Sequence, residues 1–165
     1  MTLTEIAAGT TVFIDANIFI YHFVGQSEDC TSFLARVEKG DLQGVTGPIS
    51  ILEVAHRLMM LEAIEHGLSM TSNPAARLAR QPQLVRRLSK YYFSLLAILR
   101  FGIEVLPLPQ DFVTVSQEFR QSRGLLVNDS LVPMHMRQAR VSARASGDEG
   151  FDKNPGIQRF QPSDV

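Results

Sequence analysis

Four acidic residues could act together: three lie in or at the end of apolar segments, where an unpaired carboxylate is costly, and the fourth lies in a glycine-flanked turn. They are Asp15 after the run Val12-Phe13-Ile14, Glu53 and Asp129 in largely apolar segments, and Asp148 between glycines. Oxygen-only ligands prefer hard cations such as Mg²⁺ or Mn²⁺. The four acids therefore predict one divalent-metal site assembled by the fold.

A cation held in this way can polarise a phosphoryl oxygen and lower the pKa of a bound water. Ordinary structural explanations remain open for three of the acids. Asp129 also suits the start of a helix, Asp148 suits a turn, and Glu53 suits a solvated helix surface. Asp15 is the strongest candidate, because a buried strand has little need to end in an acid. It also allows a second interpretation, a phosphohydrolase in which Asp15 is the covalent nucleophile.

Predicted strands and helices alternate along the chain, which indicates a three-layer α/β/α sandwich around a parallel sheet of about five strands. The strands are expected at 11–14, 44–46, 103–106, 141–145 and 156–160. The helices are expected at 27–39, 48–66, 82–100, 111–122 and 128–140, with a turn-rich segment at 68–81. Ligands gather at the carboxyl ends of parallel strands, so all four acids can reach one edge of the sheet.

Length and composition predict a single domain over residues 1–165, with an extended helical region at about 68–101. The net charge of -1 provides no global basic field for nucleic acid. The longest apolar run, Val12 to Val24, is interrupted by polar residues, so no membrane segment is expected. Cys30 is the only cysteine, which excludes an internal disulfide and is compatible with the cytoplasm.

Four segments together resemble the sequence motifs of PIN domains, in the family's order and over most of the chain. The first is Val12-Phe13-Ile14-Asp15-Ala16-Asn17-Ile18-Phe19, and the second is Ser50-Ile51-Leu52-Glu53-Val54-Ala55. The third is Leu126-Val127-Asn128-Asp129-Ser130-Leu131, and the fourth runs from Ser146 to Asp152. Each segment alone is weakly specific, but all four in order are a strong signal.

The resemblance implies a metal-dependent endoribonuclease that uses Mg²⁺ or Mn²⁺, most similar to the VapC-type toxins of toxin–antitoxin pairs. RNA would be the substrate, a cognate antitoxin the protein partner, and a homodimer the expected assembly. Asp15, Glu53, Asp129 and Asp148 would form the catalytic acidic quartet. Asn17 and Ser146 would support it, and Asp152 would be an auxiliary acid.

Basic residues without any intervening acid extend from Asn73 to Arg100, and Arg137, Arg140 and Arg144 form a second basic set. Arg80, Arg86 and Arg87 are candidates for contacting an RNA backbone, with neighbouring aromatic residues available for stacking. Arginines also commonly solvate an exposed helix face. A third interpretation of the chain is accordingly a non-catalytic module that binds RNA or protein.

Overall fold

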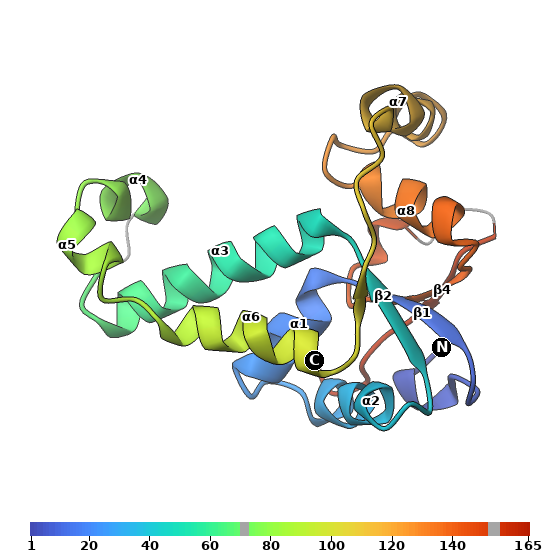
Figure 1. The fold of residues 1–165 in the computed structure, drawn as a ribbon, viewed down its shortest axis with the longest axis horizontal. Coiled ribbons are helices and arrows are strands. Elements are labelled where there is room, and N and C mark those ends of the chain that lie inside the picture. Colours follow the sequence, from blue (N-terminus) through green and yellow to red (C-terminus); the bar gives the residue numbers. More distant parts are fainter. Residues whose placement is uncertain (70–72, 152–155) are drawn as a thin grey trace.

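The computed structural model describes residues 1–69, 73–151 and 156–165, with the backbone alone described at residue 151. Its centre is a five-stranded, entirely parallel sheet in the order β3-β2-β1-β4-β5 (Figure 1). The strands are β1 (Thr11–Ile14), β2 (Gln43–Thr46), β3 (Glu104–Val105), β4 (Ala143–Ala145) and β5 (Gln158–Phe160). The parallel α/β fold class predicted from the sequence is confirmed.

Alternate side chains of β1 divide the apolar core between the two faces of the sheet. Val12 and Ile14 pack with α1 (Ala16–Phe23), α2 (Glu28–Glu38), α3 (Pro48–Glu65) and α6 (Lys90–Arg100). Phe13 points to the opposite face and packs with α8 (Leu131–Ala139). The helix α7 (Phe112–Arg123) lies against α8. The strands are short, and the burial of β1 on both faces explains why its sequence is an apolar run rather than an alternating one.

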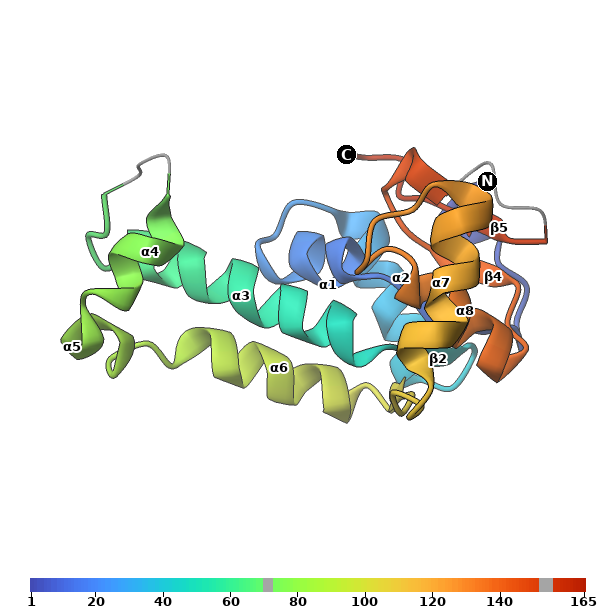
Figure 2. The same ribbon diagram turned by 90° about the horizontal axis from the view of Figure 1, so that it is seen from above.

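An arm formed by α3 and α6 extends away from the sheet, and α4 (Pro74–Ala79) and α5 (Pro82–Val85) lie at its outer end (Figures 1 and 2). The buried carboxylate of Glu62 on α3 fixes the start of α6. It accepts hydrogen bonds from the backbone N–H groups of Ser89, Lys90 and Tyr91 at 2.8–3.0 Å. These N–H groups lack partners within a helix, so Glu62 satisfies them from a neighbouring element.

The prediction of one continuous helix over 82–100 was wrong. The chain instead forms α5 and α6, separated by residues 86–89, because Glu62 caps the second helix from a distant position in the sequence. The segment predicted to be only turn-rich at 68–81 contains α4 in its described part.

Two other helices differ from prediction. Helix α1 was not predicted, because its apolar residues directly continue those of β1, and Asp15 between them caps the helix. Helix α8 begins at Leu131 instead of at 128, so Asp129 lies in the turn before it. None of the helices within the described ranges combines the length and the apolar character needed to cross a membrane.

Candidate active site

The four predicted acids line one small pocket at the carboxyl edge of the sheet, with a volume of about 100 Å³. Asp15 follows β1, Asp148 follows β4, Glu53 lies near the start of α3, and Asp129 precedes α8. Their convergence from four separate segments is what the sequence predicted. Asn17 and Arg144 also line the pocket, together with Ala16, Ile49, Ser50, Asn128 and Val132.

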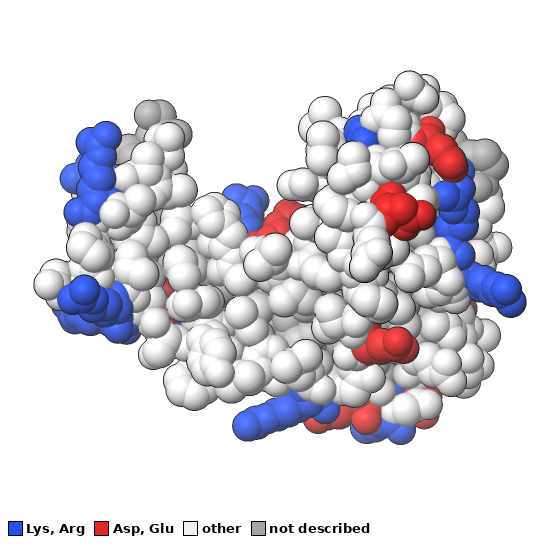
Figure 3. Space-filling model, turned by 45° about the horizontal axis from the view of Figure 1, so that its top comes forward, with Lys and Arg blue, Asp and Glu red and all other residues white. Residues whose placement is uncertain are grey.

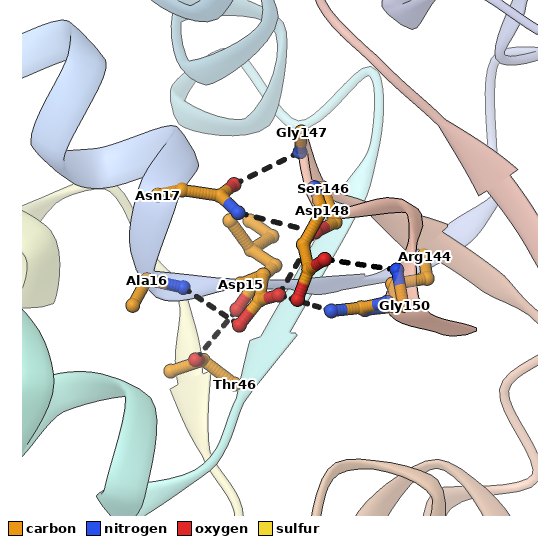
Figure 4. Close-up of polar contacts among 10 residues, drawn as sticks. Asp15, Ala16, Asn17, Thr46, Arg144, Ser146, Gly147, Asp148 and Gly150 are labelled. Atoms are coloured by element: carbon orange, nitrogen blue, oxygen red, sulfur yellow. Dashed lines mark hydrogen bonds and ion pairs between the residues drawn. The ribbon is translucent and has the colours of Figure 1, made fainter. Parts of the chain in front are cut away.

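Asp15 is the most deeply placed of the four acids, with only 9% of the residue exposed. Its Oδ1 accepts a hydrogen bond of 2.9 Å from the backbone N–H of Ala16, at the start of α1. Its Oδ2 accepts one of 2.9 Å from the hydroxyl of Ser146 and forms an ion pair with the guanidinium of Arg144 (Figure 4). The carboxylate is therefore held by the helix, by β4 and by the residue after β4.

Ser146 connects the ends of β1 and β4 through a hydroxyl that makes three hydrogen bonds. It donates to Asp15, and it accepts from Nδ2 of Asn17 at 3.2 Å and from the backbone N–H of Asp148 at 3.0 Å (Figure 4). One donor and two acceptor directions are all that a hydroxyl offers. The Oδ1 atom of Asn17 accepts from the backbone N–H of Gly147 at 3.0 Å. Both predicted supporting residues thus lie where they orient Asp15 and the loop of Asp148.

Two of the acids experience an environment that opposes their ionisation. Desolvation, and then the charge of Asp15, raises the pKa of Glu53. Desolvation, and then the charges of Asp148 and Asp15, raises the pKa of Asp129. Both side chains keep some contact with water, and their raised pKa values reflect partial burial first and the neighbouring like charges second.

The donor set fits a hard cation in its chemistry, since it consists of carboxylate oxygens that repel one another. The spacing fits less well. No three His, Cys, Asp or Glu side chains among the described residues are grouped closely enough to hold a metal ion in this conformation. The acids share a pocket without forming a coordination shell, and Arg144 provides a positive charge inside it.

Arg144 is the pocket residue whose position the sequence did not reveal. It was placed in a basic set with Arg137 and Arg140, near the late acids, but those two side chains are exposed while Arg144 is 0% exposed. The available signal was its place between Ala143 and Ala145 in a short buried strand. The predicted auxiliary acid Asp152 lies outside the described residues.

The predicted RNA-binding arginines lie elsewhere, at the outer end of the arm. Arg80, Arg86 and Arg87 are exposed, and basic side chains gather on that end of the molecule (left of Figure 3). They are not among the described residues that line the acidic pocket. Any joint action of the pocket and the arm therefore requires a ligand that extends along the molecule.

Comparison with known proteins agrees with this architecture. Ribonuclease VapC2 of Methanocaldococcus jannaschii is 25% identical over 143 residues, which are 86% of this chain and 87% of that relative. A chain in the crystal structure of VapBC2 from Rickettsia felis bound to a DNA fragment from their promoter superposes with a TM-score of 0.56 and 16% identity. The superposition covers 93% of this chain and 99% of that one. The family model of the PIN domain matches residues 12–157, and the protein therefore belongs to the PIN domain family.

Proposed function

We propose that this protein is a metal-dependent endoribonuclease and the toxin of a toxin–antitoxin pair. The observation that carries the proposal is the convergence of Asp15, Glu53, Asp129 and Asp148 on one pocket at the carboxyl edge of a parallel sheet. Membership of the PIN domain family supports a nuclease, and the similarity to a protein named Ribonuclease VapC2 supports RNA as the substrate.

The four acids would hold Mg²⁺ or Mn²⁺, which supplies a Lewis acid for the phosphodiester and lowers the pKa of water. The protein's own contribution is to fix the acids. Ser146 and Asn17 orient Asp15 and the start of the Asp148 loop through the hydrogen bonds described above. Asp152 remains a candidate auxiliary acid from the family resemblance alone.

The arm would contact the RNA away from the cleaved bond. Helix α3 carries Glu53 near its start and ends at Glu65, on the order of 18 Å further along its axis from the rise per residue of an α-helix. Arg80, Arg86 and Arg87 lie beyond that end on exposed surfaces. Phosphate contacts there would position a strand that spans several nucleotides, without specifying its sequence.

A cognate antitoxin and a second copy of the chain complete the proposed set of partners. The resemblance to VapC-type toxins supports both. Co-expression of the toxin with the product of a small adjacent reading frame would test the antitoxin, because a true antitoxin restores growth and co-purifies. Sedimentation of the purified chain alone would test the homodimer.

The nuclease itself is tested by incubating the purified chain with a pool of structured RNAs in EDTA, Mg²⁺ or Mn²⁺. We expect internal cleavage with either metal and none in EDTA, with full recovery when metal is returned. Equal cleavage in EDTA would contradict metal dependence, and a protein that is folded but inactive on cellular RNA in every metal would contradict the nuclease. Radiolabelled phosphate trapped on Asp15 would instead favour the phosphohydrolase.

A further inference from the structure

The side chain of Arg144 is fully buried and extends from β4 to the acidic pocket. It lies at the centre of β4 and pairs in register with Phe13 of β1, so both side chains are on the face covered by α8. The residue is 0% exposed. Its guanidinium brings a positive charge to this site.

The guanidinium binds the acid that lies deepest in the pocket. Arg144 donates to Oδ2 of Asp15, and the hydroxyl of Ser146 donates to the same oxygen (Figure 4). A carboxylate oxygen has two lone-pair directions, so these two donors use the capacity of Oδ2. The other oxygen, Oδ1, already accepts from the backbone N–H of Ala16.

The charge of Arg144 also acts on the neighbouring acids. Its residue lines the same pocket as Asp15, Asp129 and Asp148. The pocket thus contains a positive charge that offsets part of the repulsion among its carboxylates. A divalent cation would do the same from the centre of the pocket, and it would be repelled by the guanidinium beside it.

We propose that Arg144 is an internal competitor of the divalent cation, and that cation binding requires Arg144 to release Asp15. This inference rests on the proposed metal-dependent function. It adds that Arg144 weakens the affinity of the pocket for the metal ion. It accounts for acids that share a pocket but are not grouped as a coordination shell in this conformation. In the metal-free protein Arg144 holds Asp15, and in the metal-bound protein Asp15 would be released from Arg144.

The test is Mn²⁺ binding, measured by the electron paramagnetic resonance signal of free Mn²⁺, with no RNA present. Arg144→Met removes the charge and keeps an apolar stem in the buried strand. If Arg144 holds Asp15 in nine-tenths of the molecules, its removal should tighten Mn²⁺ binding about tenfold, because apparent affinity scales with the competent fraction. Mn²⁺ should also raise the Tm of Arg144→Met more than that of the unmodified protein.

Arg57→Met is the matched control, because Arg57 is an exposed arginine of α3 whose charge lowers the pKa of Glu53, and it is not among the described residues that line the pocket. We expect it to change Mn²⁺ affinity much less than Arg144→Met. An equal gain in both variants would indicate a general effect of charge and would overturn direct competition.

A measurement on the unmodified protein covers the case in which Arg144→Met does not fold. NMR of arginine Nη–H groups during titration with Mg²⁺ should show one buried guanidinium, absent from Arg144→Lys, that changes with the same Kd as metal binding. A signal that does not change while metal binds would overturn the proposal.

The remaining outcomes separate this inference from the proposed function. If the unmodified protein binds metal and Arg144→Met binds it equally or more weakly, the proposed competition is contradicted and the proposed nuclease function is not. Mn²⁺ binding by Arg144→Met but not by the unmodified protein would support the proposal that Arg144 competes with the cation. No binding by any variant would contradict both the metal-dependent nuclease and the inference.

Discussion

The hydroxyl of Ser146 lies 2.9 Å from Oδ2 of Asp15, and this hydrogen bond joins the carboxyl ends of the central strand β1 and its neighbour β4. The same hydroxyl accepts from Asn17 and from the backbone of Asp148. One buried oxygen therefore aligns Asp15 after β1, Asn17 in α1 and the loop after β4. Asn17 and Ser146 are therefore linked to each other, and Ser146 is linked to Asp15.

Ser146→Ala should lower both stability and cleavage. The substitution leaves the partly buried donors of Asn17 and Asp148 without their acceptor and removes one of the two donors to Oδ2 of Asp15. Such a loss costs about 1–3 kcal/mol of unfolding free energy. Urea unfolding and kcat measure the two effects. Ser146→Thr, which keeps the hydroxyl, should preserve the activity. An alanine variant with normal kcat would show that this network does not position Asp15.

Asp129→Asn should make the metal-free protein more stable while it loses activity. The folded pKa of Asp129 is raised, so its ionised form is disfavoured by folding, and stability falls as pH rises through that pKa. The gain from Asn should thus be present at neutral pH and vanish below the unfolded pKa. Thermal unfolding at several pH values in EDTA measures it. A less stable Asp129→Asn protein at neutral pH would contradict mutual repulsion in the pocket.

Glu62→Gln should loosen the arm. Burial acts to raise the pKa of Glu62, but the N–H groups of Tyr91, Lys90 and Ser89 outweigh it, so the folded pKa is lowered. The stabilisation is therefore present at neutral pH and is lost as pH falls below the ordinary Glu value and through the folded pKa. We expect a loss of about 1–3 kcal/mol in urea unfolding at neutral pH, and faster hydrogen exchange at these three amides.

Glu65→Gln is the control for that experiment. Glu65 forms an ion pair of 3.0 Å with Lys90, also between α3 and α6, but both side chains are more than half exposed. Exposed pairs contribute only about 0–1 kcal/mol. Equal losses in Glu62→Gln and Glu65→Gln would show that buried capping is not what holds α6.

Replacing Arg80, Arg86 and Arg87 together by alanine should weaken RNA binding but leave the cleavage step intact. Single-strand contacts contribute a slope of about 0.7 each to the dependence of log K on log salt, so the slope should fall by about 2. Filter binding over a salt series measures the slope, with Arg100→Ala at the other end of α6 as control. An unchanged slope would place these arginines outside the RNA-binding surface.

The alternation of strands and helices could be predicted from the sequence because buried parallel strands are apolar and several of the helices end at clear signals. The helix α6 boundary could not, since it depends on Glu62, whose contact with Ser89–Tyr91 exists only in the folded chain. Helix α1 was hidden because its apolar residues continue the preceding strand.

The acidic residues of the candidate site were predictable for a different reason. Asp15, Glu53 and Asp129 stand out because their neighbours in the sequence are apolar, and Asp148 stands out because its segment follows the other three in the family's order. The position of Arg144 was misjudged because the sequence suggested an exposed side chain. A single arginine among basic neighbours suggests a solvated surface, and only the pairing of β4 with β1 shows that it points inward to Asp15.

The most direct test of the proposed function is metal-dependent RNA cleavage by Asp15→Asn, beside the unmodified protein and Asp41→Asn. Asp41 is an exposed acid before β2 and outside the pocket, so its variant controls for the change from carboxylate to amide. Our account predicts rapid cleavage by the unmodified protein and by Asp41→Asn, and none by a folded Asp15→Asn in Mg²⁺ or Mn²⁺. Full cleavage by Asp15→Asn would contradict a catalytic site built on this pocket.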